Sequence, residues 1–331
     1  MSNYTVSITQ SADKFDTKVE SEVLGPDVDL NVITARDPVE IGLQAKDSDA
    51  VLVWRTPIAK EAIDQMAKCK VIVRIGIGYD IVDIHAARDR GIPVCNVPDY
   101  GTNDVADHTL ALMLNLRRGI GNFNDAVREG NSGWDYTVAG NLSRLTDQTL
   151  GIIGLGRIGT AVALRAKAFG MKVAFYDPYC SPGQEKAIGV VRKATVEDLL
   201  KDSDVVSIHT PLTDETRNFA SHKFFSAIKH GAILINTARG GIVDIDALEI
   251  AMREGKISGA GLDVWPTEPP NPVTSLMQEW RDNADWIKGR LIATPHSAFY
   301  NAESYHEMRS KAAQTVRDVL DGYPARNCVN L

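Results

Sequence analysis

The chain has 331 residues, more than one ordinary hydrophobic core supports, so we expect two domains of roughly 100 to 200 residues each. Hydrophobic residues make up 44% of the chain and charged residues 24%, and the net charge of −7 would repel a phosphate backbone, which argues against nucleic-acid binding. No apolar run reaches the roughly 20 residues of a membrane span. Met1 to Phe15 lacks the charged region followed by an apolar region that marks a signal peptide, so we expect a cytoplasmic protein.

The chain has four cysteines, and they lie far apart without a C-x-x-C spacing. This spacing favours free thiols in a reducing compartment over disulfides or a metal site. We therefore predict packing roles for Cys69, Cys95, Cys180 and Cys328.

Short apolar runs alternate with helix-like stretches in the first part of the chain. This alternation is typical of βα units, which build a parallel sheet covered by helices on both faces. The runs are Tyr4 to Ile8, Leu30 to Thr34, Ala50 to Trp54, Val71 to Ile75 and Ile92 to Cys95, and Ala59 to Ala67 is a predicted helix between two of them.

Two of these predicted strands end in residues suited to bind an anion. Ala50 to Trp54 leads into Arg55, and Arg74 is followed by Gly76-Ile77-Gly78. Backbone amides exposed by glycines and two guanidinium groups would attract a carboxylate. The alternative for this stretch alone is a tight βα turn with surface arginines.

A helix follows, with Asn103 or Asp104 as its cap, and the stretch before it is a plausible interdomain crossing. Between Gly119 and Thr149 no strand pattern appears. Trp134 and Tyr136 stand in this region of mixed polarity, which predicts a dimer contact.

A glycine-bearing turn, Leu150 to Gly159, joins an apolar run to the helical stretch Thr160 to Phe169. Its three glycines have the G-x-G-x-x-G spacing, which permits a tight turn, approach of backbone to a pyrophosphate and close helix packing. Asp177 ends the next apolar run, where a carboxylate accepts hydrogen bonds from the adenosine ribose. These features together predict a site for NAD.

The second βα series continues through five further runs to Leu291 to Thr294, and six strands complete a dinucleotide-binding fold. A helical tail, Asn301 to Asp321, could return to the first domain. We therefore predict an α/β protein with two doubly wound parallel-sheet domains: a flavodoxin-like substrate domain of residues 1–102 and 303–331, and a Rossmann NAD-binding domain of residues 103–302.

Polar residues cluster after three strands of the second series, at ends that meet over the cofactor in a doubly wound sheet. Hydride transfer to a ketone creates an alkoxide, so the site needs a cation and an acid. Arg239 and His296 supply them, and Glu268 is the best candidate to orient the imidazole ring. A lone histidine is more often structural, and the other six histidines fit that interpretation.

These motifs resemble the D-isomer-specific 2-hydroxyacid dehydrogenases over nearly the whole chain. The resemblance rests on Gly154-x-Gly156-x-x-Gly159 with Asp177, His209-Thr210-Pro211-Leu212-Thr213, Asn236-Thr237-Ala238-Arg239-Gly240-Gly241, Gly261-Leu262-Asp263-Val264 with Glu268, and Thr294-Pro295-His296. It implies an NAD-dependent dehydrogenase or reductase that acts on a small 2-ketoacid or 2-hydroxyacid and forms a homodimer through the domain around Gly154. From the composition and spacing above we expect no nucleic-acid, membrane or metal partner.

The resemblance also implies a set of site residues. The catalytic trio would be Arg239, Glu268 and His296, Asp263 would steady the nicotinamide amide, and Gly76 to Gly78 would give amides to the substrate carboxylate. The cofactor would be bound by Gly154, Gly156, Arg157, Ile158, Gly159, Asp177, His209, Thr210, Pro211, Thr216, Thr237, Ala238 and Asp263, and the substrate by Arg55, Arg74, Gly76, Ile77, Gly78 and Phe299.

Within the family the chain is most similar to the C-terminal-binding-protein branch, for example in Arg326-Asn327-Cys328-Val329-Asn330. It departs from that branch at Phe299, where the branch has tryptophan, at Val105, where it has threonine, and at Arg55, where it has histidine. An NAD-sensing binding protein like the corepressors of that branch is therefore the alternative function. Oxidation of formate or phosphite is a weaker third interpretation. Glu268 argues against the formate branch, because that branch pairs its histidine with glutamine.

Overall fold

A computed structural model describes residues 4–9, 16–140 and 142–330, and most of the N-terminal segment considered above, residues 1–3 and 10–15, lies outside this set. The chain divides into two compact units. Unit 1 comprises the described residues of Met1–Gly101 and Tyr300–Leu331, and unit 2 comprises Thr102–Phe299. The predicted domain boundaries lie within a few residues of these bounds.

Unit 1 is built on a parallel five-stranded sheet with the strand order β2-β1-β3-β4-β5. This order is that of flavodoxin-like folds. The strands are β1 (Tyr4–Thr9), β2 (Val28–Ile33), β3 (Ala50–Val53), β4 (Val71–Arg74) and β5 (Val94–Cys95). All five were predicted from the apolar runs, with ends that shift by up to two residues.

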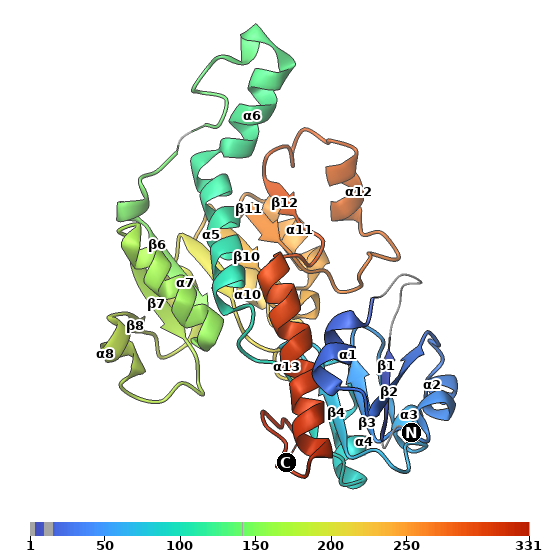
Figure 1. Ribbon diagram of the computed structural model, residues 1–331. Coiled ribbons are helices and arrows are strands. Elements are labelled where there is room, and N and C mark those ends of the chain that lie inside the picture. Colours follow the sequence, from blue (N-terminus) through green and yellow to red (C-terminus); the bar gives the residue numbers. More distant parts are fainter. Residues whose placement is uncertain (1–3, 10–15, 141, 331) are drawn as a thin grey trace. The chain divides into compact units, whose positions relative to one another are not determined.

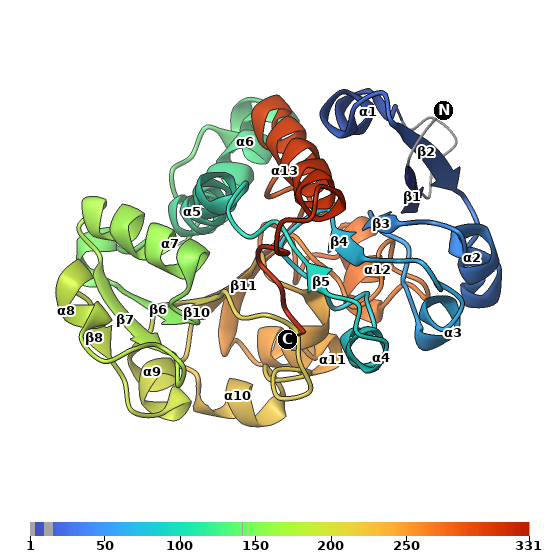
Figure 2. The same ribbon diagram turned by 60° about the horizontal axis from the view of Figure 1, so that its bottom comes forward.

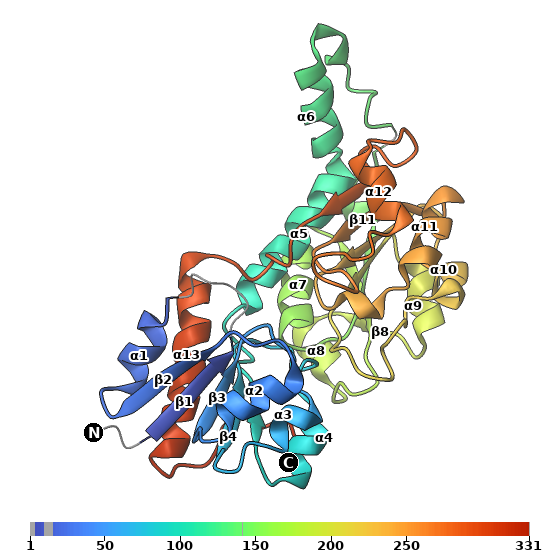
Figure 3. The same ribbon diagram turned by 90° about the vertical axis from the view of Figure 1, so that its right-hand side faces the viewer.

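Helices lie on both faces of this sheet, with α1 and α13 on one face and α2, α3 and α4 on the other (Figure 3). They are α1 (Lys18–Leu24), α2 (Pro38–Ala45), α3 (Lys60–Ile63), α4 (Ile84–Asp89) and α13 (Ala302–Leu320). The predicted return of the tail is thus confirmed, since α13 packs on α1, β3 and β4. The helix predicted over residues 59–67 is longer than the observed helix α3. The backbone hydrogen bonds change to the tighter i→i−3 pattern after Asp64, and Met66 then enters the core.

Unit 2 contains a parallel seven-stranded sheet with the order β12-β11-β10-β9-β6-β7-β8. Six of its strands follow the Rossmann order, and the seventh extends it. The strands are β6 (Thr149–Ile153), β7 (Lys172–Tyr176), β8 (Val191–Arg192), β9 (Val205–Ile208), β10 (Ala232–Asn236), β11 (Ile257–Leu262) and β12 (Leu291–Ala293). The prediction of six strands missed β8, because a strand of two residues shows no alternation in sequence.

The helices of unit 2 also form two layers: α5 and α7 cover one face of the sheet, and α9, α10 and α11 cover the other (Figure 2). The bounds are α5 (Thr102–Arg118), α6 (Ile120–Glu129), α7 (Arg157–Ala168), α8 (Gln184–Ile188), α9 (Val196–Asp202), α10 (His222–Ala227), α11 (Ile245–Arg253) and α12 (Ser275–Arg281). Within unit 2, α6 extends away from the sheet beyond the end of α5 (Figure 1).

The two units have separate buried cores. In unit 1 the core includes Ile41, Val53 and Ile72 between the sheet and α2 to α4. In unit 2 one buried cluster lies under α5 and α7 and another under α9 to α12. Across residues 4–9, 16–140 and 142–330, no helix combines the length and apolar character that crossing a membrane would require.

Candidate active site

The glycine turn of unit 2 connects β6 to α7 as the sequence predicts. Gly154 has φ = 90°, a conformation that side chains disfavour. A Cβ on Gly159 would lie 2.1 Å from the carbonyl oxygen of Gly154, so only glycine allows α7 to approach the turn so closely. Gly156, by contrast, faces open space at the start of α7. Backbone N–H groups at this helix start can therefore receive an anion that comes close to Gly156.

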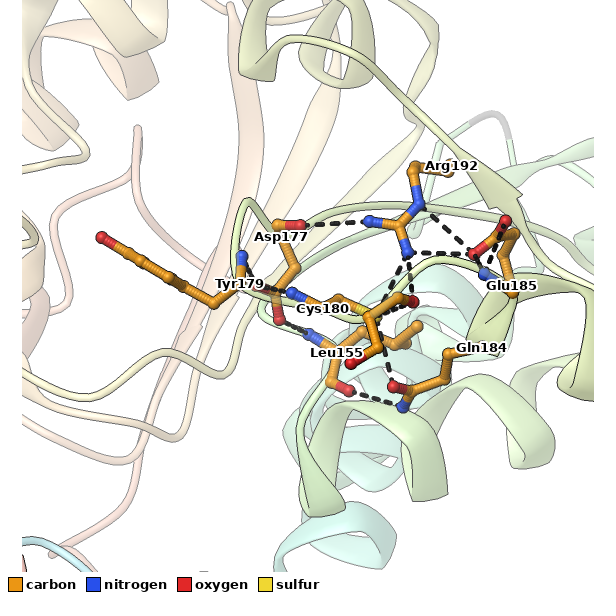
Figure 4. Close-up of polar contacts among 9 residues, drawn as sticks. Leu155, Asp177, Tyr179, Cys180, Gln184, Glu185 and Arg192 are labelled. Carbon is orange, nitrogen blue, oxygen red and sulfur yellow. Dashed lines mark hydrogen bonds and ion pairs between the residues drawn. The ribbon is translucent and has the colours of Figure 1, made fainter.

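Asp177 lies at the end of β7 and organises the loop beside this turn (Figure 4). One of its carboxylate oxygens accepts a hydrogen bond from the Leu155 N–H at 2.8 Å, and the other accepts from the N–H groups of Tyr179 and Cys180 at 2.9 and 3.1 Å. A hollow of about 530 Å³ opens at this point. It is lined by Leu155, Gly156, Arg157, Thr160, Asp177, Tyr179, Cys180, Ser181 and Gln184.

Arg192, in the short strand β8, holds the far side of this loop (Figure 4). Its guanidinium donates to the carbonyl of Ser181 at 2.9 Å and pairs with the Glu185 carboxylate at 2.9 Å. It also lies 4.8 Å from the centre of the Phe175 ring. Sequence reasoning missed Arg192, because nothing in the local sequence distinguishes it from a surface arginine.

The end of β9 lies next to the glycine turn. A Cβ on Gly154 would meet the backbone of His209 and the methyl group of Thr210 at 2.9 Å. The hydroxyl of Thr210 is buried and has no hydrogen-bond partner among the described residues. Such an orphan hydroxyl fits a site in which a bound molecule completes the hydrogen bonding.

The other predicted cofactor residues also lie in unit 2, each with contacts of its own. The imidazole of His209 lies 2.8 Å from the Ser207 hydroxyl, and desolvation lowers its pKa to about 3, so the ring is neutral. Thr216 stabilises its own turn, where its hydroxyl donates to the Pro211 carbonyl at 2.6 Å. Thr237 is buried and its hydroxyl lies 2.9 Å from that of Thr109 on α5. Ile158 is half-buried against the core below α7, and Ala238 against that below α9 to α12.

The predicted catalytic residues follow three adjacent strands, β10, β11 and β12. The Nδ1 atom of His296 lies 2.6 Å from a carboxylate oxygen of Glu268, and the two side chains are 28% and 34% exposed. The other Glu268 oxygen accepts from the Trp265 N–H at 3.0 Å, which fixes the carboxylate. The pair thus engages Nδ1 of His296 and not Nε2. The Phe299 ring stands edge-on to the imidazole, with centroids 6.4 Å apart.

Asp263 organises the loop that carries His296. Its carboxylate is 1% exposed and accepts hydrogen bonds from the N–H groups of Ser297 and Ala298 at 2.9 and 3.0 Å and from the Thr294 hydroxyl at 2.5 Å. Its carbonyl accepts from the His296 N–H at 2.7 Å. His296 has φ = 54°, a conformation that a residue other than glycine keeps only with such support. Asp263 is therefore a positioning residue for the histidine.

Arg239 is held by a tight turn after β10. The buried Asn236 side chain accepts from the Ala238 N–H at 3.0 Å and donates to the Arg239 carbonyl at 2.9 Å. A Cβ on the next residue, Gly240, would lie 1.9 Å from the backbone carbon of Trp265. The Arg239 turn is thus packed directly against the start of the segment that carries Glu268.

In unit 1, Arg74 is the last residue of β4, and Arg55 comes two residues after the neighbouring parallel strand β3. The two strands are paired in register at Val53 and Arg74. Arg55 is exposed and its guanidinium lies 6.0 Å from the centre of the Trp54 ring. The Arg74 guanidinium packs over Gly76, where a Cβ would lie 2.3 Å from Nη1.

The turn of Gly76, Ile77 and Gly78 is fixed by residues that follow β5. The Asn96 amide donates to the Ile77 carbonyl at 2.6 Å, and the Val97 N–H donates to the Gly76 carbonyl at 3.0 Å. Sequence reasoning missed Asn96, since its partner is separated from it by 19 residues.

Comparison with known proteins gives consistent matches. Residues 110–298 match the family model described as D-isomer specific 2-hydroxyacid dehydrogenase, NAD binding domain. Relatives include D-3-phosphoglycerate dehydrogenases of Methanocaldococcus jannaschii, 37% identical over 92% of this chain and 56% of the relative, and of Bacillus subtilis, 35% identical over 98% of this chain and 58% of the relative. The chain thus spans little more than half the length of these relatives.

Among solved structures, D-lactate dehydrogenase from Aquifex aeolicus, complexed with NAD and lactic acid, is similar over 96% of both chains. The TM-score is 0.83 and the sequence identity is 32%. The cofactor predicted from the glycine turn, NAD, agrees with the family model and with this complex.

Proposed function

Because the chain belongs to the D-isomer specific 2-hydroxyacid dehydrogenase family, we propose that it is an NAD-dependent oxidoreductase acting at C2 of a 2-hydroxyacid or 2-ketoacid. The observation that carries the proposal is the 2.6 Å pair of His296 and Glu268, held at strand ends of the NAD-binding domain. The corepressor-like alternative is not favoured, since the matched relatives are dehydrogenases.

Unit 2 has the features that NAD requires. We propose that the N–H groups at the start of α7 bind the pyrophosphate beside Gly156, that Asp177 accepts the ribose hydroxyls, and that Thr210 pairs with the bound molecule. When bound, the nicotinamide supplies or accepts the hydride. Asp177 lines the hollow, and the same loop contacts hold its carboxylate there.

The chain's own residues then stabilise the developing charge and transfer the proton. In reduction, Nε2 of His296 donates a proton to the oxygen that develops at C2, and Glu268 at Nδ1 holds the ring and stabilises its positive charge. Arg239 binds the substrate carboxylate, for which its planar guanidinium is suited. In oxidation, His296 accepts the proton from the C2 hydroxyl.

We further propose that the Gly76 to Gly78 turn gives N–H groups to the substrate carboxylate, and that Arg55 and Arg74 favour a substrate with a second anionic or polar group. Arg55 is exposed, so its charge is available, and D-3-phosphoglycerate, named in two relatives, carries such a group. Phe299 would supply an apolar wall beside His296. The alternative is that Arg74 only assists the first carboxylate and that Arg55 faces solvent or pairs with a nearby acid.

The test is NADH oxidation by the full chain with a panel of 2-ketoacids, from pyruvate to longer ones bearing a terminal carboxylate, sulfonate, phosphate or hydroxyl. Turnover with at least one of them is expected, and no turnover with any would overturn the proposal. Arg55→Ala should lower kcat/KM by about tenfold for doubly anionic substrates, equivalent to about 1.4 kcal/mol, and leave pyruvate unchanged. An equal effect on all substrates, or on none, would refute the role of Arg55.

We also propose that the protein is a homodimer, with the segment between α6 and β6 in the interface. Trp134 and Tyr136 in this segment are 75% and 87% exposed, and Ile120 and Val127 on α6 are also exposed. Large exposed apolar side chains on a projecting segment are typical of a subunit interface. Sedimentation equilibrium of the wild type and of Trp134→Ser tests this, with dissociation expected in the variant.

A further inference from the structure

The C-terminal segment of unit 1 places two cysteines opposite each other. Cys95 ends strand β5, and Cys328 forms an isolated antiparallel bridge with it. The flanking hydrogen bonds run from the Val329 N–H to the Val94 carbonyl at 2.8 Å and from the Asn96 N–H to the Asn327 carbonyl at 3.3 Å. Bonds at these flanking residues make Cys95 and Cys328 a non-hydrogen-bonded pair, the type whose side chains come closest.

The geometry of such a pair matches that of a disulfide. The Cα atoms of a non-hydrogen-bonded antiparallel pair are about 4.5 Å apart, within the range of about 4.4 to 6.8 Å seen in disulfides. Both thiols are free in this structure. Burial, followed by the neighbouring Cys328 thiol, raises the pKa of Cys95 to about 12.

We propose that Cys95 and Cys328 form a reversible disulfide when the protein meets an oxidised low-molecular-weight thiol, and that this bond fastens the C-terminal segment to β5. The prediction of packing roles for these two cysteines was made from sequence spacing, which cannot show that residues 95 and 328 are cross-strand neighbours. The inference does not depend on the proposed dehydrogenase activity.

The exchange begins at Cys328, which is half-buried, whereas Cys95 is fully buried. The Cys328 thiolate attacks one sulfur of glutathione disulfide, forms a mixed disulfide and releases one glutathione thiolate. Cys95 then loses its proton to solvent and attacks the Cys328 sulfur, which releases the second glutathione. Two protein thiols are oxidised and one glutathione disulfide is reduced to two thiols. Because the Cys95 thiolate is scarce, we expect minutes to hours for completion.

The disulfide would also stabilise residues outside the C-terminal segment. Asn96 and Val97, directly after Cys95, hold the Ile77 and Gly76 carbonyls. On the other side, the Asn330 side chain accepts from the Val94 N–H at 2.8 Å and donates to the Ile92 carbonyl at 2.9 Å. Opening of the C-terminal segment must break this edge of the sheet, so the disulfide should protect β5 and the turn that it supports.

The experiment treats the full chain with glutathione disulfide, with a sample in reduced glutathione as reference. Peptide mass analysis without reduction should show a cross-linked pair containing Cys95 and Cys328. Hydrogen exchange at Asn96, Val97 and Val329 should slow several-fold on oxidation and recover with dithiothreitol. Cys328→Ala should abolish both effects, whereas Cys180→Ala, which removes another half-buried thiol, should change neither.

Two results would overturn the inference. One is glutathione that stays on Cys328 while Cys95 remains reduced, which would show that the strand pairing holds the thiols apart. The other is a cross-link without slower exchange at the three amides, which would show that the segment is already as firmly held without it. Both readouts compare oxidised and reduced wild type, so they stand even if a variant folds poorly.

Discussion

At the scale of single residues, the site depends on side chains that are held by partners far away in sequence. The Glu268 carboxylate meets His296 across 28 residues and is itself fixed by a backbone N–H. An imidazole ring fixed in this way is suited to the acid role that we propose for His296.

We predict that His296→Ala lowers kcat by roughly 10²- to 10⁴-fold, the range for loss of a general acid, while NADH still binds. Glu268→Gln keeps the shape of the partner but removes its charge, so it should have a smaller effect than His296→Ala. Steady-state kinetics and NADH fluorescence titration measure the two quantities. A His296→Ala enzyme with near-normal turnover would disprove the assignment.

The second prediction concerns the choice between NAD and NADP. Asp177 should repel the extra phosphate of NADP, and Arg192 cannot compensate because it is paired with Glu185 at 2.9 Å. We expect kcat/KM to favour NADH over NADPH in the wild type. Asp177→Asn should weaken NADH use by about tenfold without a gain for NADPH, which corresponds to about 1.4 kcal/mol.

Adding Glu185→Gln to Asp177→Asn should raise activity with NADPH, because Arg192 is then available to a phosphate. The single variant Glu185→Gln is the matched control and should keep the preference for NADH. Equal kcat/KM for the two cofactors in the wild type would show that Asp177 does not select between them.

At the scale of elements, the turns after β6 and β10 depend on glycine for different reasons. A Cβ on Gly240 would collide with the backbone of Trp265 at 1.9 Å, whereas a Cβ on Gly156 meets open space. Gly240 is thus required by packing within the protein. At Gly156 no described atom lies close enough to a Cβ for packing to require glycine.

We predict that Gly240→Ala lowers the free energy of unfolding by about 2–4 kcal/mol, since backbone rather than a flexible side chain must move. Gly156→Ala should leave stability within about 0.5 kcal/mol but weaken NADH binding by about tenfold or more. Urea denaturation and NADH titration of both variants give the comparison. Unchanged NADH affinity in Gly156→Ala would mean that the pyrophosphate lies elsewhere.

At the scale of the whole molecule, unit 1 is assembled from both ends of the chain. Arg309 on α13 forms an ion pair with Glu20 on α1 at 2.5 Å, and the two side chains are only 6% and 0% exposed. A buried charge that loses its partner is costly, so this pair links the N-terminal and C-terminal parts of unit 1.

We predict that Glu20→Gln destabilises unit 1 by about 3–5 kcal/mol, because it removes the carboxylate charge that pairs with the buried Arg309 guanidinium. The double variant Glu20→Leu with Arg309→Met should recover most of the loss, since an apolar pair of similar volume removes both charges. Hydrogen exchange should accelerate in α1 and α13 and stay unchanged in α7 of unit 2. Equal acceleration in all three helices would contradict the assignment of the pair to unit 1 alone.

Most strands and the glycine turn of this protein were predictable from residues that lie close together in the sequence. The apolar runs predicted all five strands of the first sheet and six of the seven in the second, and the glycine spacing predicted the turn between β6 and α7. These features depend on residues close in sequence, because strand burial, positive φ and helix starts are decided within a few positions. The NAD cofactor and the family followed from the same motifs.

Other features were decided only by the tertiary structure. Asn96 supports the Gly76 to Gly78 turn, and Arg192 anchors the loop of Asp177. Cys95 faces Cys328, which is far away from it in the sequence. No local pattern encodes these contacts, since they arise when β5 pairs with the C-terminal segment and when β8 joins the edge of its sheet. The sequence by itself thus determined most of the elements, the family and the cofactor, whereas the pairing of distant strands decided which side chains hold the candidate site in place.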